Sequence, residues 1–130
     1  MGLDMYLSGS QYFWNTEWRV DDKPVKQAEV EIGYWRKHPN LHGYIVDTFA
    51  KGEDVCQRIE LTLDDVNKII EAINDGTLPH TEGFFFGKSD LTDDQKAYDL
   101  SIFEEARKWL DADPKIHGFS TRSIIYQASW

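Results

Sequence analysis

The alternation of apolar and polar residues predicts several short strands. Residues 3–8 (LDMYLS) alternate with the period of two that is typical of a strand with one buried face. Residues 29–34 (EVEIGY) show the same alternation, although a helix over residues 28–38 that continues into the next segment also fits. Strands are further predicted over residues 55–61 and 123–129. The strands therefore lie at both ends of the chain and near its middle.

Between the first two strands, residues 9–26 carry turn-forming residues and no clean periodicity. We expect an irregular excursion here, with a short hairpin that turns at Asp21 and Asp22.

Apolar residues at helical spacing predict three helices. Pro39 suits the first turn of a helix, where its missing N–H is not needed. Thr62 and Thr92 are placed to cap the second and third helices. The helices are expected over residues 39–52, 62–76 and 92–113. The buried stripe predicted for the third helix consists of Tyr98, Ile102, Phe103, Ala106 and Leu110.

Three helices and three to four strands that do not alternate strictly predict one α+β domain over residues 1–130, with a small, mostly antiparallel sheet. The single Cys56 cannot form an internal disulfide, which favours a cytosolic compartment. No apolar run approaches the roughly 18 residues that span a bilayer, and the N-terminus lacks the pattern of a secretory signal. We therefore expect no membrane partner.

The charge is unevenly distributed along an acidic chain. The formal net charge is −9, and residues 47–113 carry 17 acids against 7 Lys or Arg. Residues 32–46 and 114–130 carry two Lys or Arg each and no acid. If these two segments meet in space, they form a positive pocket on a negative body. The acidic balance also argues against binding of duplex nucleic acid.

The segment 34–42 (YWRKHPNLH) is the strongest candidate for a binding site. Arg36 and Lys37 suit a phosphate group, and the ring of Tyr34 or Trp35 can stack on a base. The alternative is that Trp35 belongs to the core and that both cations are solvated surface residues.

The segment GFFFG at residues 83–87 is a second feature that calls for a partner. Three consecutive Phe residues in an extended segment cannot all face one core, because neighbours point to opposite sides. An ordinary loop that closes the core, a subunit interface and a ligand contact all remain open. The first of these is the simplest.

Catalysis and metal binding find no support in the sequence pattern. His38 and His42 have the i, i+4 spacing of half a metal site, but nothing completes a ligand set with His80 or His117. Carboxylate pairs fall at helix starts or on polar helix faces, and Ser and His residues show no spacing typical of a triad. We expect no metal, no cofactor and no catalytic residue.

Four segments together resemble a family of small bacteriophage and prophage proteins without an established activity. They are MGLDMYL at the start, YWRK followed by His42, GFFFG, and YQASW at residues 126–130. Some members carry a phosphoglycerate kinase label, which a chain of 130 residues without a nucleotide-cradling loop does not support. Pro39 departs from the family pattern and leaves open whether Arg36 and Lys37 lie on a helix or before one.

The resemblance implies that the shared positions contribute to one site. The candidate ligand-binding residues are Tyr34, Trp35, Arg36, Lys37, His42, Phe84, Phe85, Arg122, Tyr126 and Trp130. The expected function is anti-defence, in the cytoplasm of the host bacterium: the protein would sequester an anionic, nucleotide-like signalling molecule without catalysis. The alternatives are an acidic inhibitor or decoy that binds a host defence protein, and a small nucleotide-modifying enzyme. The aromatic segments also predict a homo-oligomer.

Overall fold

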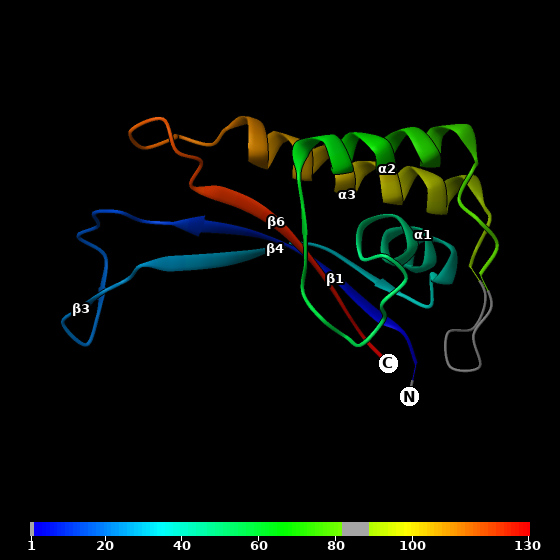
Figure 1. Ribbon diagram of the computed structural model, residues 1–130, viewed down its shortest axis with the longest axis horizontal. Helices are drawn as coiled ribbons and strands as arrows, with labels where there is room; N and C mark the ends of the chain where they lie inside the picture. Colours follow the sequence, from blue (N-terminus) through cyan, green and yellow to red (C-terminus); the bar gives the residue numbers. More distant parts are fainter. Residues whose placement is uncertain (1, 82–88) are drawn as a thin grey trace.

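A four-stranded antiparallel sheet carries three helices on one side (Figure 1). The computed structural model describes residues 2–81 and 89–130, and all element counts refer to these ranges. The strand order is β4-β1-β6-β5, and every neighbouring pair is antiparallel. The strands are β1 (Asp4–Tyr12), β4 (Gln27–Arg36), β5 (Ile59–Leu61) and β6 (Arg122–Ser129). This arrangement confirms the predicted α+β class.

The helices are α1 (Pro39–Phe49), α2 (Leu63–Asp75) and α3 (Asp93–Asp111), close to their predicted ranges. Thr62 caps α2 and forms a reciprocal capping box with Asp65, and Thr92 caps α3. Gly76 ends α2 in the left-handed conformation, with φ of 67°. The caps read from the sequence therefore set the ends of α2 and α3. None of the helices in the described part of the chain has the length and hydropathy needed to cross a membrane.

The sheet resolves the question left open for residues 28–38. Residues 27–36 pair with β1 as a strand, and the partner of Arg36 across the ladder is Asp4. Lys37 then turns the chain with a φ of 59°, and α1 begins at Pro39. Arg36 and Lys37 therefore both precede the helix.

The predicted strand over residues 55–61 is wrong in its first half. Only Ile59–Leu61 pairs with β6. Cys56 has a φ of 60°, which breaks an extended run, and the side chain of Gln57 accepts a hydrogen bond from the backbone N–H of Val55. The local turn therefore replaces ladder pairing over residues 55–58.

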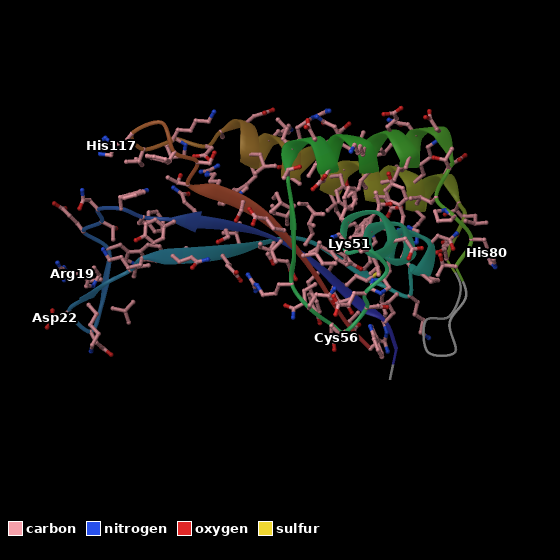
Figure 2. The ribbon with its side chains drawn as sticks, in the orientation of Figure 1. Arg19, Asp22, Lys51, Cys56, His80 and His117 are labelled. Atoms are coloured by element: carbon pink, nitrogen blue, oxygen red, sulfur yellow. The ribbon has the colours of Figure 1, made fainter. Side chains whose placement is uncertain are left out.

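Residues 13–26 form an arm that projects beyond the helices (Figure 1), whereas residues 9–12 of the expected excursion continue β1 and pair within the sheet. The arm carries a hairpin of β2 (Arg19–Val20) and β3 (Lys23–Pro24), which confirms the predicted turn. Asp21 and Asp22 both have positive φ, as in the turn that matches the twist of hairpin strands. Figure 2 places Arg19 and Asp22 at the end of the arm.

The core lies between the sheet and the helices. The predicted stripe of α3 is correct for Ile102, Phe103 and Ala106, which are buried. Tyr98 is instead exposed, and its neighbour Asp99 is buried. The face of α3 toward the core therefore includes a carboxylate, which the apolar stripe did not anticipate.

Asp113 ties the end of α3 to the start of β6. Its carboxylate accepts the backbone N–H of Lys115 at 2.9 Å and that of Arg122 at 3.0 Å. It also accepts the N–H and the hydroxyl of Thr121, the latter at 2.8 Å. Burial opposes ionisation, but the three backbone N–H groups and the hydroxyl outweigh it and lower the pKa of Asp113 from 3.8 to about 2.

Asp113→Asn is expected to destabilise the protein at pH 7 and to remove one source of acid sensitivity. Because the folded pKa is depressed, the wild-type carboxylate stabilises the fold fully above about pH 4 and loses this contribution as the pH falls toward 2. Urea unfolding between pH 2 and 7 should show that wild type has a higher free energy of unfolding than Asp113→Asn at pH 7, and that this difference disappears as the pH falls from about 4 to 2. Asp111→Asn, at an exposed neighbouring position, is the matched control. A difference in free energy of unfolding that does not change with pH contradicts the prediction.

Candidate functional site

Two buried histidines stand one helical turn apart at the start of α1, and each pairs with a carboxylate. His38 Nε2 lies 2.7 Å from Asp99 Oδ2, and His42 Nε2 lies 2.9 Å from Asp54 Oδ2. The exposed fractions of His38 and His42 are 5% and 2%. Both acids come from other elements: Asp99 from α3 and Asp54 from the loop that follows α1.

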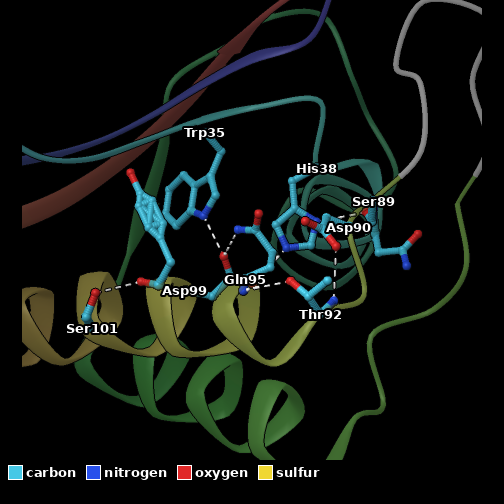
Figure 3. Close-up of polar contacts among 10 residues, drawn as sticks. Trp35, His38, Ser89, Asp90, Thr92, Gln95, Asp99 and Ser101 are labelled. Atoms are coloured by element: carbon cyan, nitrogen blue, oxygen red, sulfur yellow. Dashed lines mark hydrogen bonds and ion pairs between the residues drawn. The ribbon is translucent and has the colours of Figure 1, made fainter.

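Asp99 is the centre of the first cluster (Figure 3). Besides His38, the indole N–H of Trp35 donates to Asp99 Oδ1 at 2.7 Å. The side-chain amide of Gln95 donates to the same oxygen at 2.8 Å. Asp99 is only 2% exposed, so three protein donors replace the water that would otherwise solvate the carboxylate.

Ser89 extends this cluster on the other side of the imidazole. Ser89 Oγ lies 2.8 Å from His38 Nδ1 and accepts the backbone N–H of Asn40 at 3.0 Å. Because His38 Nε2 faces a carboxylate, it carries the proton in the neutral ring, and Nδ1 is then the acceptor. Ser89 therefore donates to His38, and His38 donates to Asp99. The hydroxyl also caps α1 in place of the helix's own N-cap residue, whose side chain makes no cap hydrogen bond.

A hollow of about 260 Å³ opens beside this cluster. It lies where the N-termini of α1 and α3 meet the C-terminus of α2. The apolar part of its lining consists of Ile73, Leu78 and Leu91. The polar part consists of His38, Asn40, Asp90, Thr92, Asp93, Gln95, Lys96 and Asp99. The hollow thus combines apolar walls with hydrogen-bonding groups of both kinds, the usual character of a small-molecule site.

Three of the candidate residues belong to the core. Trp35, His42 and Tyr126 are buried, and the side chain of each is engaged by another protein side chain. The hydroxyl of Tyr126 donates to His42 Nδ1 at 2.6 Å, and burial raises the pKa of this phenol well above its usual value. These residues face the protein interior. For Trp35 this confirms the alternative that it belongs to the core.

Of the other candidate residues, Arg122 lies apart from those at the end of β4, whereas Trp130 follows the β6 residue that pairs with Asp4 at that same end. Arg36 and Lys37 are exposed at the end of β4. Arg122 lies at the far end of the sheet, opposite Gln11 rather than Asp4. Seven residues along β1 separate these two ends, roughly 23 Å at about 3.3 Å per residue. There the guanidinium of Arg122 stacks on the ring of Trp109 at 3.9 Å.

Among the residues that the structure describes, Arg36 and Lys37 lie at one end of the sheet and Arg122 at the other, so these cations do not form the positive pocket expected from the two acid-free segments. Acids from elsewhere in the chain enter both segments. Asp4 accepts a hydrogen bond from Tyr34, and Asp54 accepts one from Trp130. Asp99 accepts from Trp35, as described above. Phe84 and Phe85 lie outside the described residues.

The sequence analysis did not predict Asp99 or Ser89 as site residues. A signal for Asp99 was present: it stands at position i with Ile102, Phe103 and Ala106 at i+3, i+4 and i+7, on the buried face of α3. A carboxylate on such a face needs a buried partner. Ser89 carries no comparable signal, because its contacts to His38 and Asn40 span 51 and 49 residues.

Metal binding finds no arrangement to support it. Within residues 2–81 and 89–130, no group of three or more His, Cys, Asp or Glu is placed to hold a metal ion. His80 and His117 lie at opposite ends of the molecule (Figure 2). Both ring nitrogens of His38 and of His42 already contact protein side chains.

Comparison of the chain with protein-family models, with curated proteins and with solved structures finds no match.

Proposed function

We propose that the protein binds a small, nucleotide-like ligand and withholds it unaltered, as a bacteriophage accessory protein acting against a host defence. The observation that carries the proposal is the hollow of about 260 Å³ beside His38. The resemblance to small phage proteins supports the biological setting, in the cytoplasm of the host bacterium. Such a ligand would place its base in the hollow and its charged group outside it.

The lining of the hollow suits a base better than a phosphate. Asp90 and Asp93 contribute carboxylates, which repel a phosphate, and Lys96 contributes one cation. Leu78 and Leu91 offer apolar walls to the flat faces of a ring. The volume lies below the roughly 300–1,000 Å³ of drug-sized sites, which favours one heterocycle over a whole dinucleotide.

The charged part of the ligand would then lie outside the hollow. Arg36 and Lys37 are exposed and immediately precede His38, which lines the hollow. A phosphate that extends from the bound base toward these side chains would gain charge-assisted hydrogen bonds. The proposal therefore separates base binding from phosphate binding, and each can be tested with its own variant.

A thermal-shift panel of nucleosides, cyclic nucleotides and ADP-ribose-type nucleotides tests the proposal. A ligand at a hundred times its Kd stabilises the fold by about 2.7 kcal/mol. We expect stabilisation by at least one nucleotide, and its loss in Leu91→Trp, which fills the hollow from an exposed position. Val55→Trp, also exposed but away from the hollow, is the matched control. Arg36→Ala with Lys37→Ala should weaken nucleotide binding and leave nucleoside binding in place.

Heating the complex and analysing the released ligand separates retention from turnover. Intact nucleotide supports sequestration, whereas an altered nucleotide supports the nucleotide-modifying enzyme. Stabilisation that is equal in Leu91→Trp and wild type places the ligand elsewhere and contradicts the proposed site.

One observation favours a direct inhibitor of a host protein as the second candidate. Trp14, Trp18 and Phe119 are each about half exposed or more, at 47%, 56% and 64%. The arm of residues 13–26, which carries both tryptophans, contains three acids and three Lys or Arg and is therefore neutral on a chain of net charge −9. Exposed aromatic surface of this kind typically serves a protein interface, including one between two copies of the chain. A panel without any nucleotide response favours this candidate.

A further inference from the structure

The geometry points to a second activity at the same hollow: Ser89, His38 and Asp99 form a nucleophile, a base and an orienting carboxylate able to cleave an activated ester. This inference uses the hollow of the proposed function but a different class of ligand. A ligand without a reactive carbonyl near Ser89 is only held, whereas an ester placed there is cleaved.

The hydrogen-bond directions are those that such a mechanism needs. The hydroxyl of Ser89 donates to His38 Nδ1 across 2.8 Å, within the reach expected of a nucleophile and its base. His38 Nε2 donates to Asp99 across 2.7 Å, which fixes the tautomer that leaves Nδ1 free to take a proton. The backbone N–H of Asn40 donates to Ser89 Oγ and so leaves the hydroxyl proton directed at His38.

The base and its carboxylate are held rigidly. Trp35 and Gln95 both donate to Asp99 Oδ1, while Oδ2 faces His38 (Figure 3). His38 and Asp99 are both nearly inaccessible to solvent. A carboxylate fixed in this way stabilises the imidazolium that forms when His38 takes the proton.

The nucleophile lies beside the hollow, next to residues that line it. Ser89 is only partly buried. The two residues that its hydroxyl contacts, His38 and Asn40, both line the hollow, and so does the next residue, Asp90. The leucines of the lining favour a small apolar acyl group.

The reaction balances without a cofactor. Ser89 Oγ attacks the carbonyl carbon of the ester, and its proton passes to His38 Nδ1. The bond to the leaving oxygen then breaks, and that oxygen takes the proton from Nδ1 and departs as an alcohol, leaving acyl-Ser89. Water attacks the acyl carbon in the second half, with its proton again accepted by Nδ1, and the free acid and the original hydroxyl result.

A fluorophosphonate probe tests this inference on the full chain. Ser89 Oγ would form a bond to phosphorus while fluoride leaves, and peptide mass spectrometry would locate the adduct. We expect labelling at Ser89, its absence in Ser89→Ala, and a decrease of at least a hundredfold in rate in Asp99→Asn, which disrupts the tautomer of His38. The same variants should lose any burst of p-nitrophenol from p-nitrophenyl acetate.

Ser101→Ala is the matched control, because Ser101 is an exposed serine of α3 whose hydroxyl donates to the backbone carbonyl of Tyr98. The variant should keep full labelling at Ser89. Thermal unfolding of each variant shows that the chain remains folded, and His38→Gln gives a second route to removing the base. Folded wild type that is unlabelled at Ser89, or labelled equally at Ser101, overturns the inference. Nucleotide stabilisation is measured without the probe, so the two proposals fail independently.

Discussion

Replacing Asp99 with alanine is expected to lower the free energy of unfolding by about 3–5 kcal/mol, the largest effect of any single change considered for this protein. Trp35 and His38 each lose the acceptor of a buried hydrogen bond, and Gln95 loses the acceptor of a part-buried one. A buried donor without a partner costs far more than an intact hydrogen bond contributes. Since domains of this size have about 5–15 kcal/mol of stability in total, this loss is a large fraction of the stability of the fold.

Urea denaturation followed by tryptophan fluorescence measures this effect, because Trp35 reports on the cluster directly. Glu104→Ala removes an exposed carboxylate of the same helix and should cost less than 0.5 kcal/mol, roughly the range of surface substitutions. Asp99→Asn keeps the side-chain volume and one acceptor oxygen, so its loss of stability should lie between those of Glu104→Ala and Asp99→Ala. A loss in Asp99→Ala below about 1 kcal/mol would show that the cluster is solvated rather than buried.

Replacing Gly9 with alanine should cost about 2–3 kcal/mol through overpacking. An added Cβ would lie 2.7–2.9 Å from three atoms of the Trp109 ring. The ring cannot retreat easily, because its indole N–H donates to the Ser123 carbonyl and the Arg122 guanidinium stacks on it. The sheet and α3 would have to move apart at this point.

Gly76→Ala separates the steric cost from the conformational cost of replacing a glycine. Gly76 has a φ of 67°, and an added Cβ would meet no atom within 4 Å, so only the left-handed backbone is penalised, by about 1 kcal/mol. Gly9→Ala should therefore be the more damaging change in thermal unfolding. In a Trp109→Leu background the cost of Gly9→Ala should fall, and additive costs would contradict the steric explanation.

The local features of the fold could be read from the sequence, since they depend on neighbouring residues. Thr62, Thr92 and Gly76 set helix ends, and Asp21 with Asp22 set a hairpin. Each of these rules acts within a few positions along the chain. The same locality explains why the α+β class followed from the pattern of elements.

The candidate site could not be read in this way, because its contacts connect distant positions. The carboxylate next to His38 comes from 61 residues away, and Asp4 reaches Tyr34 across 30 residues. Counting charges along the chain indicated two acid-free segments, but strand pairing and helix packing bring acids into both. Linear charge patterns thus predict a local potential only when the segment's neighbours in space are known.

The external cap of α1 makes the end of this helix depend on a distant part of the chain. Helices α2 and α3 are each capped by the threonine that directly precedes them. The backbone N–H of Asn40 in the first turn of α1 instead donates to the hydroxyl of Ser89, 49 residues further along the chain. A peptide of residues 38–50 alone would lack that acceptor, and at this length isolated helices are marginal in water. The first turn of α1 is therefore complete only when Ser89, which precedes α3 in the sequence, has packed against it.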